Sequence, residues 1–152
     1  LAVFLFMRNM IKFSDVSVLT EEIDDTEFGY DLVDGKYQLP KGIKVFEING
    51  PLFFGAAYKF KDAMHYIGKH PPVLIIRMRH VPIIDATGIQ TLKEVHKKSL
   101  KHHTKIILSE LQSEQVKKEL HDSRLLFAIG KGNVKDSFEK ALERAEQILR
   151  EK

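Results

Sequence analysis

Residues 73–88 read VLIIRMRHVPIIDATG, and the interpretation of the fold starts from this stretch. The nearly unbroken apolar run at 73–78 is typical of a strand buried on both faces, as in the middle of a parallel sheet. Asp85 stands where the N-cap of a following helix belongs, and its carboxylate is expected to accept a hydrogen bond from the backbone N–H of Thr87 or Gly88. Because glycine is costly inside a helix, Gly88 indicates that something approaches the backbone closely there.

The apolar spacing along the rest of the chain predicts an α/β fold, in which strands alternate with helices. The predicted strands are 14–19, 43–48, 73–78, 105–108 and a short one at 125–129. The predicted helices are 56–68, 89–101, a short one around Val116 and Leu120, and 138–149, the last capped by Asn133 or Asp136. A small hairpin is expected around Asp34-Gly35. This order indicates a single domain with a mixed, largely parallel sheet and helices packed on it.

The bulk composition excludes several classes of protein. The 152 residues carry 43% hydrophobic and 30% charged side chains, as in an ordinary globular domain. A net charge of +3 is too small to indicate nucleic-acid binding. The absence of cysteine excludes disulfides and thiolate metal sites.

Other candidate sites are weaker. Of the seven histidines, His96 and His103 could share a helical face, but no carboxylate stands at a ligand spacing beside these two, so no metal site is predicted. No Ser-His-Asp set, paired carboxylates or nucleotide fingerprint is present, so no catalytic residue is assigned. A small α/β enzyme using Asp85 is disfavoured because no base or nucleophile stands at a recognisable spacing. The basic stretch Lys97–Lys105 is either a solvated helix end or a surface facing anionic lipid headgroups.

The chain starts with Leu1-Ala-Val-Phe-Leu-Phe-Met7, a wholly apolar segment followed by Arg8 and Lys12. Seven residues are too few to span a bilayer, which needs roughly 20. The segment is therefore either the cytoplasmic end of a transmembrane helix or an edge strand or short helix packed on the domain.

Two motifs together resemble a known family. Asp85-Ala-Thr-Gly88 between a strand and a helix resembles the STAS domain of sulfate transporters and anti-sigma factor antagonists. Gly50-Pro-Leu-Phe-Phe-Gly55 after the strand at 43–48 is similar to a segment of the STAS domain found at the C-terminus of SulP-type anion transporters. The resemblance covers residues 43–149 well and residues 1–13 loosely.

The resemblance implies functions for particular residues. Thr87 would be the phosphoacceptor or regulatory residue, within an interaction loop formed with Asp85, Ala86 and Gly88. A second group would anchor the connection between strand and helix: Pro51, Phe53, Phe54 and Gly55. Residues 1–13 would be the end of a transmembrane helix and a juxtamembrane linker, and residues 14–152 the STAS domain.

The implied function is regulatory and non-catalytic, at the cytoplasmic face of the membrane in a sulfate or other anion transporter. The partners would be the transporter membrane domain and, in addition, other regulatory proteins or a second copy of the chain. No cofactor is expected, apart from the weak nucleotide binding that the resemblance allows. The alternative is a free-standing anti-sigma factor antagonist switched by phosphorylation of Thr87.

Overall fold

The computed structural model describes residues 15–18, 40–52 and 70–151, with the backbone alone described at 15–18. The elements are β1 (Asp15–Val18), β2 (Ile43–Asn49), β3 (Val73–His80), α3 (Ala86–Lys101), β4 (Lys105–Ser109), α4 (Glu114–Asp122), α5 (Leu125–Ile129), the 3₁₀ turn η1 (Lys131–Asn133), β5 (Val134–Lys135) and α6 (Phe138–Arg150). The helix predicted at 56–68 and the hairpin around Asp34-Gly35 lie outside the described residues.

The five strands form one sheet in the order β1-β2-β3-β4-β5. Strands β2 to β5 are parallel to one another, and β1 pairs with β2 in the antiparallel direction. The register places Ile75 of β3 between Val45 of β2 and Ile107 of β4. The mixed, largely parallel sheet predicted from the sequence is therefore confirmed.

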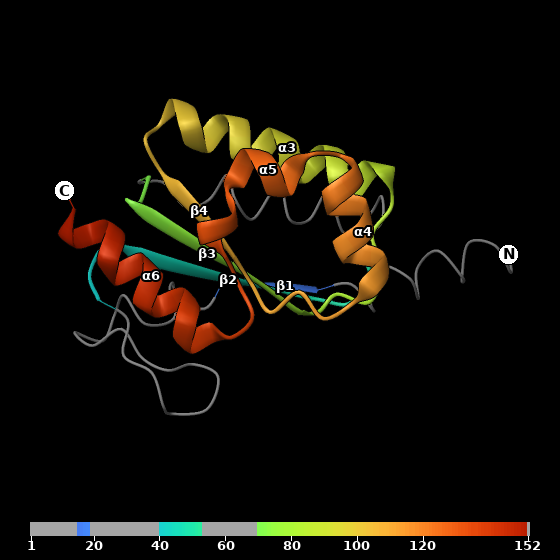
Figure 1. Cartoon of the computed structure of the whole chain (residues 1–152), viewed down its shortest axis with the longest axis horizontal. Helices are drawn as coiled ribbons and strands as arrows, with labels where there is room; N and C mark the ends of the chain where they lie inside the picture. Colours follow the sequence, from blue (N-terminus) through green and yellow to red (C-terminus); the bar gives the residue numbers. More distant parts are fainter. Residues whose placement is uncertain (1–14, 19–39, 53–69, 152) are drawn as a thin grey trace, which may run out of the picture.

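Helices cover both faces of this sheet (Figure 1). The face that carries α3, α4 and α5 receives Phe46 and Ile48 of β2, together with Leu74, Ile76 and Met78 of β3. The opposite face receives Ile43 and Val45 and packs against α6. Alternate residues of the predicted strand at 43–48 thus face opposite sides of the sheet, which follows from the twofold period of a strand.

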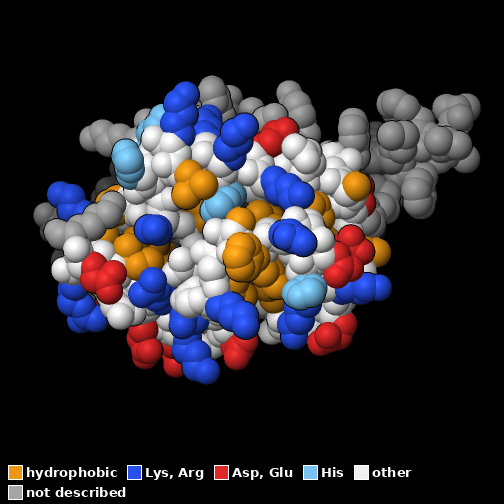
Figure 2. All heavy atoms as spheres, turned by 45° about the horizontal axis from the view of Figure 1, so that its top comes forward, with side chains coloured by type: hydrophobic (Ala, Val, Ile, Leu, Met, Phe, Trp, Pro, Cys, Tyr) orange, Lys and Arg blue, Asp and Glu red, His pale blue; other side chains and the backbone are white. Residues whose placement is uncertain are grey.

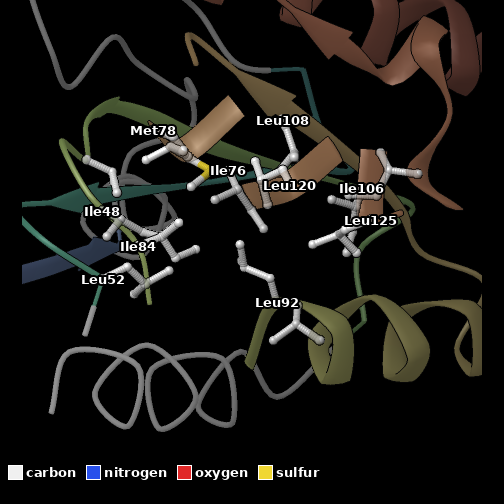
Figure 3. Close-up of a cluster of buried hydrophobic side chains, with 14 of the residues drawn as sticks. Ile48, Leu52, Ile76, Met78, Ile84, Leu92, Ile106, Leu108, Leu120 and Leu125 are labelled. Carbon is white, nitrogen blue, oxygen red and sulfur yellow. The ribbon is translucent and has the colours of Figure 1, made fainter. Parts of the chain in front are cut away.

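The larger core lies between the sheet and α3 (Figure 3). Leu92 of α3 and Leu120 of α4 point into this core with Ile76 of β3, and each is at most 3% exposed. Burial of one such side chain contributes about 1.5–3 kcal/mol. This layer fixes the position of α3, whose first turn carries the candidate site.

Two predictions in the C-terminal part were wrong. Residues 125–129 form the helix α5 rather than a strand: Leu125 and Ile129, four residues apart, are buried on one helical face. Short apolar runs do not distinguish the two structures, because periodicity needs a longer window. The N-cap of α6 is Ser137, whose Oγ accepts from the N–H of Lys140 at 3.2 Å.

The residues expected to cap α6 lie elsewhere. Asn133 donates from Nδ2 to the carbonyl of Ile129 and accepts from Nε of Arg144. Strand β5 intervenes between Asn133 and α6, and Asp136 lies one residue before the cap. The two-residue strand carries too little apolar pattern to be detected from the sequence.

Candidate functional site

The candidate site lies where the connection after β3 meets the start of α3. Ile84 forms an isolated parallel bridge with Leu52, which follows β2. The N–H of Leu52 donates to the carbonyl of Ile83 at 3.0 Å, and the N–H of Asp85 donates to the carbonyl of Leu52 at 3.4 Å. The two quoted motifs, far apart in sequence, are therefore joined by backbone hydrogen bonds at the carboxyl edge of the sheet.

Asp85 is the N-cap of α3, as predicted. Its backbone is extended, and its Oδ1 accepts from the N–H of Gly88 at 2.8 Å. The backbone carbonyl of Asp85 accepts the first helical hydrogen bond, from Ile89 at 3.0 Å. A cap of this kind contributes about 1 kcal/mol and holds the first turn of the helix in place.

Gly88 is in close contact with the bridge residues. A Cβ at this position would lie 2.4 Å from the carbonyl oxygen of Leu52 and 2.6 Å from Cγ1 of Ile84. Both neighbours are at most 2% exposed. The close approach inferred from glycine at this position is confirmed, and it identifies what approaches: the segment carrying the second motif.

Thr87 lies half-buried in the first turn of α3. Its carbonyl accepts from Oγ1 of Thr91 at 2.9 Å. Pro82, Ile83 and Ala86 are exposed beside it and carry no charge. A phosphate on Thr87 would add about −1.5 to −2 charges to a turn whose nearest carboxylate in the sequence is Asp85. The helix N-terminus would favour that charge and Asp85 would oppose it.

Two polar residues at the start of α4 hold the connection rigidly, and the sequence reasoning missed both. Gln115 accepts from the N–H of Ile84 and donates to the carbonyl of Ile84, both at 2.9 Å, much as a neighbouring strand would. Ser113 donates to the carbonyl of Pro82 at 2.7 Å and caps α4. The capping position of Ser113 is detectable in the sequence. No local sequence pattern indicates the contact of Gln115 with Ile84, because the two residues are 31 positions apart.

The second motif is only partly described. Gly50 has a φ of +100°, which favours glycine, and its N–H donates to the carbonyl of His80 at 2.8 Å. Pro51 is half-buried and Leu52 is fully buried. Phe53, Phe54 and Gly55 lie outside the described residues, so their predicted anchoring function stays a prediction.

A buried ion pair lies on the α6 face of the sheet and was not predicted. Arg77 of β3 donates from Nε and Nη2 to the two carboxylate oxygens of Glu110 at 2.7 and 2.8 Å. The guanidinium also stacks on the ring of Phe138, 4.2 Å from its centre. Burial alone would raise the pKa of Glu110, but the hydrogen bonds and charge of Arg77 outweigh burial and hold that pKa below its usual value. The pair joins β3 to the residue after β4 and stabilises the sheet beneath α6.

Within residues 15–18, 40–52 and 70–151, no group of three or more histidine, aspartate or glutamate side chains lies close enough to hold a metal ion. In the same part of the chain, no helix has the length and apolar character needed to cross a membrane.

The fold and the capped turn define a class: a small α/β domain in which the carboxyl edge of a parallel sheet presents a helix N-terminus. A model of the STAS domain family matches residues 36–141, and the chain belongs to this family. The family proposed from the two motifs is thus confirmed.

Relatives show which branch of the family the chain resembles. A solved sulfate transporter family protein from Wolinella succinogenes is 36% identical, with a TM-score of 0.72, over 78% of this chain and 96% of its own. The SulP transporter STAS domain from Vibrio cholerae is 31% identical, with a TM-score of 0.65, over 88% of this chain and 97% of its own. The "Putative sulfate transporter YvdB" of Bacillus subtilis (strain 168) is 31% identical over 59% of this chain. The chain spans 17% of that transporter's length.

Proposed function

We propose that this chain is the regulatory, non-catalytic STAS domain of a SulP-type anion transporter. In this proposal it acts at the cytoplasmic face of the membrane and docks on the transporter's membrane domain. The observation that carries the proposal is the rigid turn around Thr87, where exposed apolar side chains adjoin a capped helix start. Asp85 caps the helix, Gly88 packs on Leu52, and Gln115 clamps the preceding loop. A surface held from three sides is suited to binding a partner without first having to be ordered.

The free-standing antagonist is the second candidate, and it would use the same turn. The relatives above 30% identity that this chain covers almost fully are described as sulfate transporter proteins, which favours the transporter. The two candidates differ in the coding sequence upstream of Leu1. Several apolar segments of spanning length there would support the transporter, whereas a nearby start codon would support the antagonist.

The function of Thr87 is tested in the complete transporter by measuring sulfate uptake into cells or vesicles. We expect Thr87→Glu to change the uptake rate about fivefold or more, the usual lower bound for coupling between sites. Thr87→Ser, which keeps the hydroxyl, should behave like the unmodified protein. Gln147→Glu on α6 adds the same charge on the opposite face of the sheet and should leave uptake unchanged.

This set of variants separates regulation from misfolding. A carboxylate in the first turn of a helix stabilises it by about 0.3–1 kcal/mol, so Thr87→Glu is expected to stay folded. Equal uptake by Thr87→Glu and Thr87→Ser would contradict regulation through this surface. Weak nucleotide binding beside the same turn stays an expectation from the family resemblance, and titration of the chain with a nucleoside triphosphate would test it.

A further inference from the structure

The helical layer carries an apolar surface that the site around Thr87 does not use. Phe127 of α5 is 86% exposed, more than the other large apolar side chains of the described residues. Leu126 is half-buried beside it and Ala128 is exposed. We call Leu126, Phe127 and Ala128 the α5 patch. An aromatic side chain this exposed loses favourable burial energy of about 1.5–3 kcal/mol unless something covers it.

Basic side chains lie in and near this patch. Arg124 and His121 line the same shallow hollow as Phe127 and Leu126. Lys118 of α4 and Lys131 of η1 are exposed on the neighbouring elements. Figure 2 shows the helical layer from outside, with an apolar area bordered by blue lysine and arginine side chains.

These cations are available to an anionic partner. Within the described part of the chain, Arg124, Lys118 and Lys131 form no ion pair with a carboxylate. Asp122, the carboxylate in the hollow, lies 3.3 Å from Nδ1 of His121. Between residues 86 and 133, nine lysines and arginines face five aspartates and glutamates, so this layer has a positive net charge.

We propose that the α5 patch docks on an anionic lipid bilayer, with Phe127 inserted at the level of the headgroups and the surrounding cations held against the lipid phosphates. An aromatic group within a basic rim is the combination that anionic membrane surfaces bind. A bilayer accepts a single exposed side chain without a matching shape. A stable protein interface needs about 800 Å² on each partner, and three side chains on a short helix provide much less.

The proposed function would place a lipid bilayer close to the α5 patch. If the domain is attached to a transporter, a bilayer lies close to it, so the biological use of the patch rests on the proposed function. The binding experiment does not depend on that function. It can fail while Thr87 still regulates transport, and it can succeed in a free-standing protein.

The absence of cysteine allows a local measurement on the whole chain. Ala128→Cys introduces the sole thiol, which is labelled with an environment-sensitive fluorophore. The labelled chain is titrated with vesicles of phosphatidylcholine, either alone or with about 30% phosphatidylglycerol to supply negative charge. Glu146→Cys on α6 places the same label on the opposite face of the sheet. We expect a blue shift at position 128 with the anionic vesicles, and none at position 146.

Variants of the labelled chain then identify the groups responsible. Phe127→Ser should reduce the partition coefficient about tenfold. Arg124→Gln and Lys131→Gln should each reduce it about fivefold, and added salt should weaken binding further. These side chains are exposed, so their replacement should leave the domain folded, and circular dichroism checks this.

Two results would overturn the proposal. One is an unshifted label at position 128 while the chain sediments with the vesicles, which means that another segment binds, for example Leu1–Met7. The other is an unchanged partition coefficient in Phe127→Ser. In either case the patch is not a membrane surface, and a protein partner for α5 becomes the explanation to pursue.

Discussion

Replacing Gly88 by alanine tests whether the two motifs are held together as the structure describes. The new methyl group would lie 2.4 Å from the carbonyl oxygen of Leu52, well inside van der Waals contact. It would also lie 2.6 Å from Cγ1 of Ile84 and 3.1 Å from Cγ of Leu52. The first neighbour is backbone held by hydrogen bonds, so it cannot rotate away as a flexible side chain would.

Two opposing effects determine how much Gly88→Ala changes the free energy of unfolding. Alanine is favoured over glycine in a helix by up to about 1 kcal/mol. Forcing a methyl group into a packed site costs about 1–3 kcal/mol. Because the contact is with the backbone of Leu52, a fully buried residue, we take the upper end of that range. The free energy of unfolding should therefore fall by about 2 kcal/mol.

The assay is urea unfolding followed by circular dichroism and analysed by linear extrapolation. Gly132→Ala is the matched control, because a Cβ at that position has nothing within 4 Å and the backbone is not in the left-handed region. Its free energy of unfolding should stay within about 0.5 kcal/mol of the unmodified chain. If Gly88→Ala is as stable as Gly132→Ala, or more stable than the unmodified chain, the packing of α3 on Leu52 is not as described.

Two further predictions concern ionisable groups. Glu110→Gln should lower the free energy of unfolding by about 3 kcal/mol at neutral pH, since it leaves the charge of Arg77 buried and uncompensated, whereas the exposed Glu114→Gln should change it little. The pKa of Glu110 in the folded state lies below its usual 4.5, so ionised Glu110 stabilises the fold above that pH and this stabilisation is lost as the pH falls through the folded-state pKa. The difference in the free energy of unfolding between Glu110→Gln and the unmodified chain should therefore shrink at low pH, and a difference that persists there would contradict this. The ring of His70 stacks on that of His102, with ring centres 3.5 Å apart. Burial is the larger cause and the charge of His70 the next cause that hold the pKa of His102 below its usual value. His70→Ala should therefore raise that pKa in an NMR titration, and an unchanged pKa would show that the neighbouring ring has no influence.

The local spacing of apolar residues was sufficient to predict most of the strands and helices. Strands β2, β3 and β4 and helices α3 and α6 each carry enough apolar residues at a regular spacing to be recognised. The cap at Asp85 and the close approach at Gly88 were also predictable, because both follow from the rules of a helix start. The short elements α5 and β5 were not predictable, since five and two residues do not define a period.

The sequence by itself determined the longer strands and helices, the faces that they bury, and where α3 begins, because these properties depend on neighbours a few residues away. Only the tertiary structure decided which distant groups meet. The clamp of Gln115 on Ile84 and the pair of Arg77 with Glu110 join residues 31 and 33 positions apart. The exposure of Phe127 likewise depends on the fold, since an apolar run gives no sign of which member stays outside. Such contacts arise from the packing of whole layers, and no local spacing encodes them.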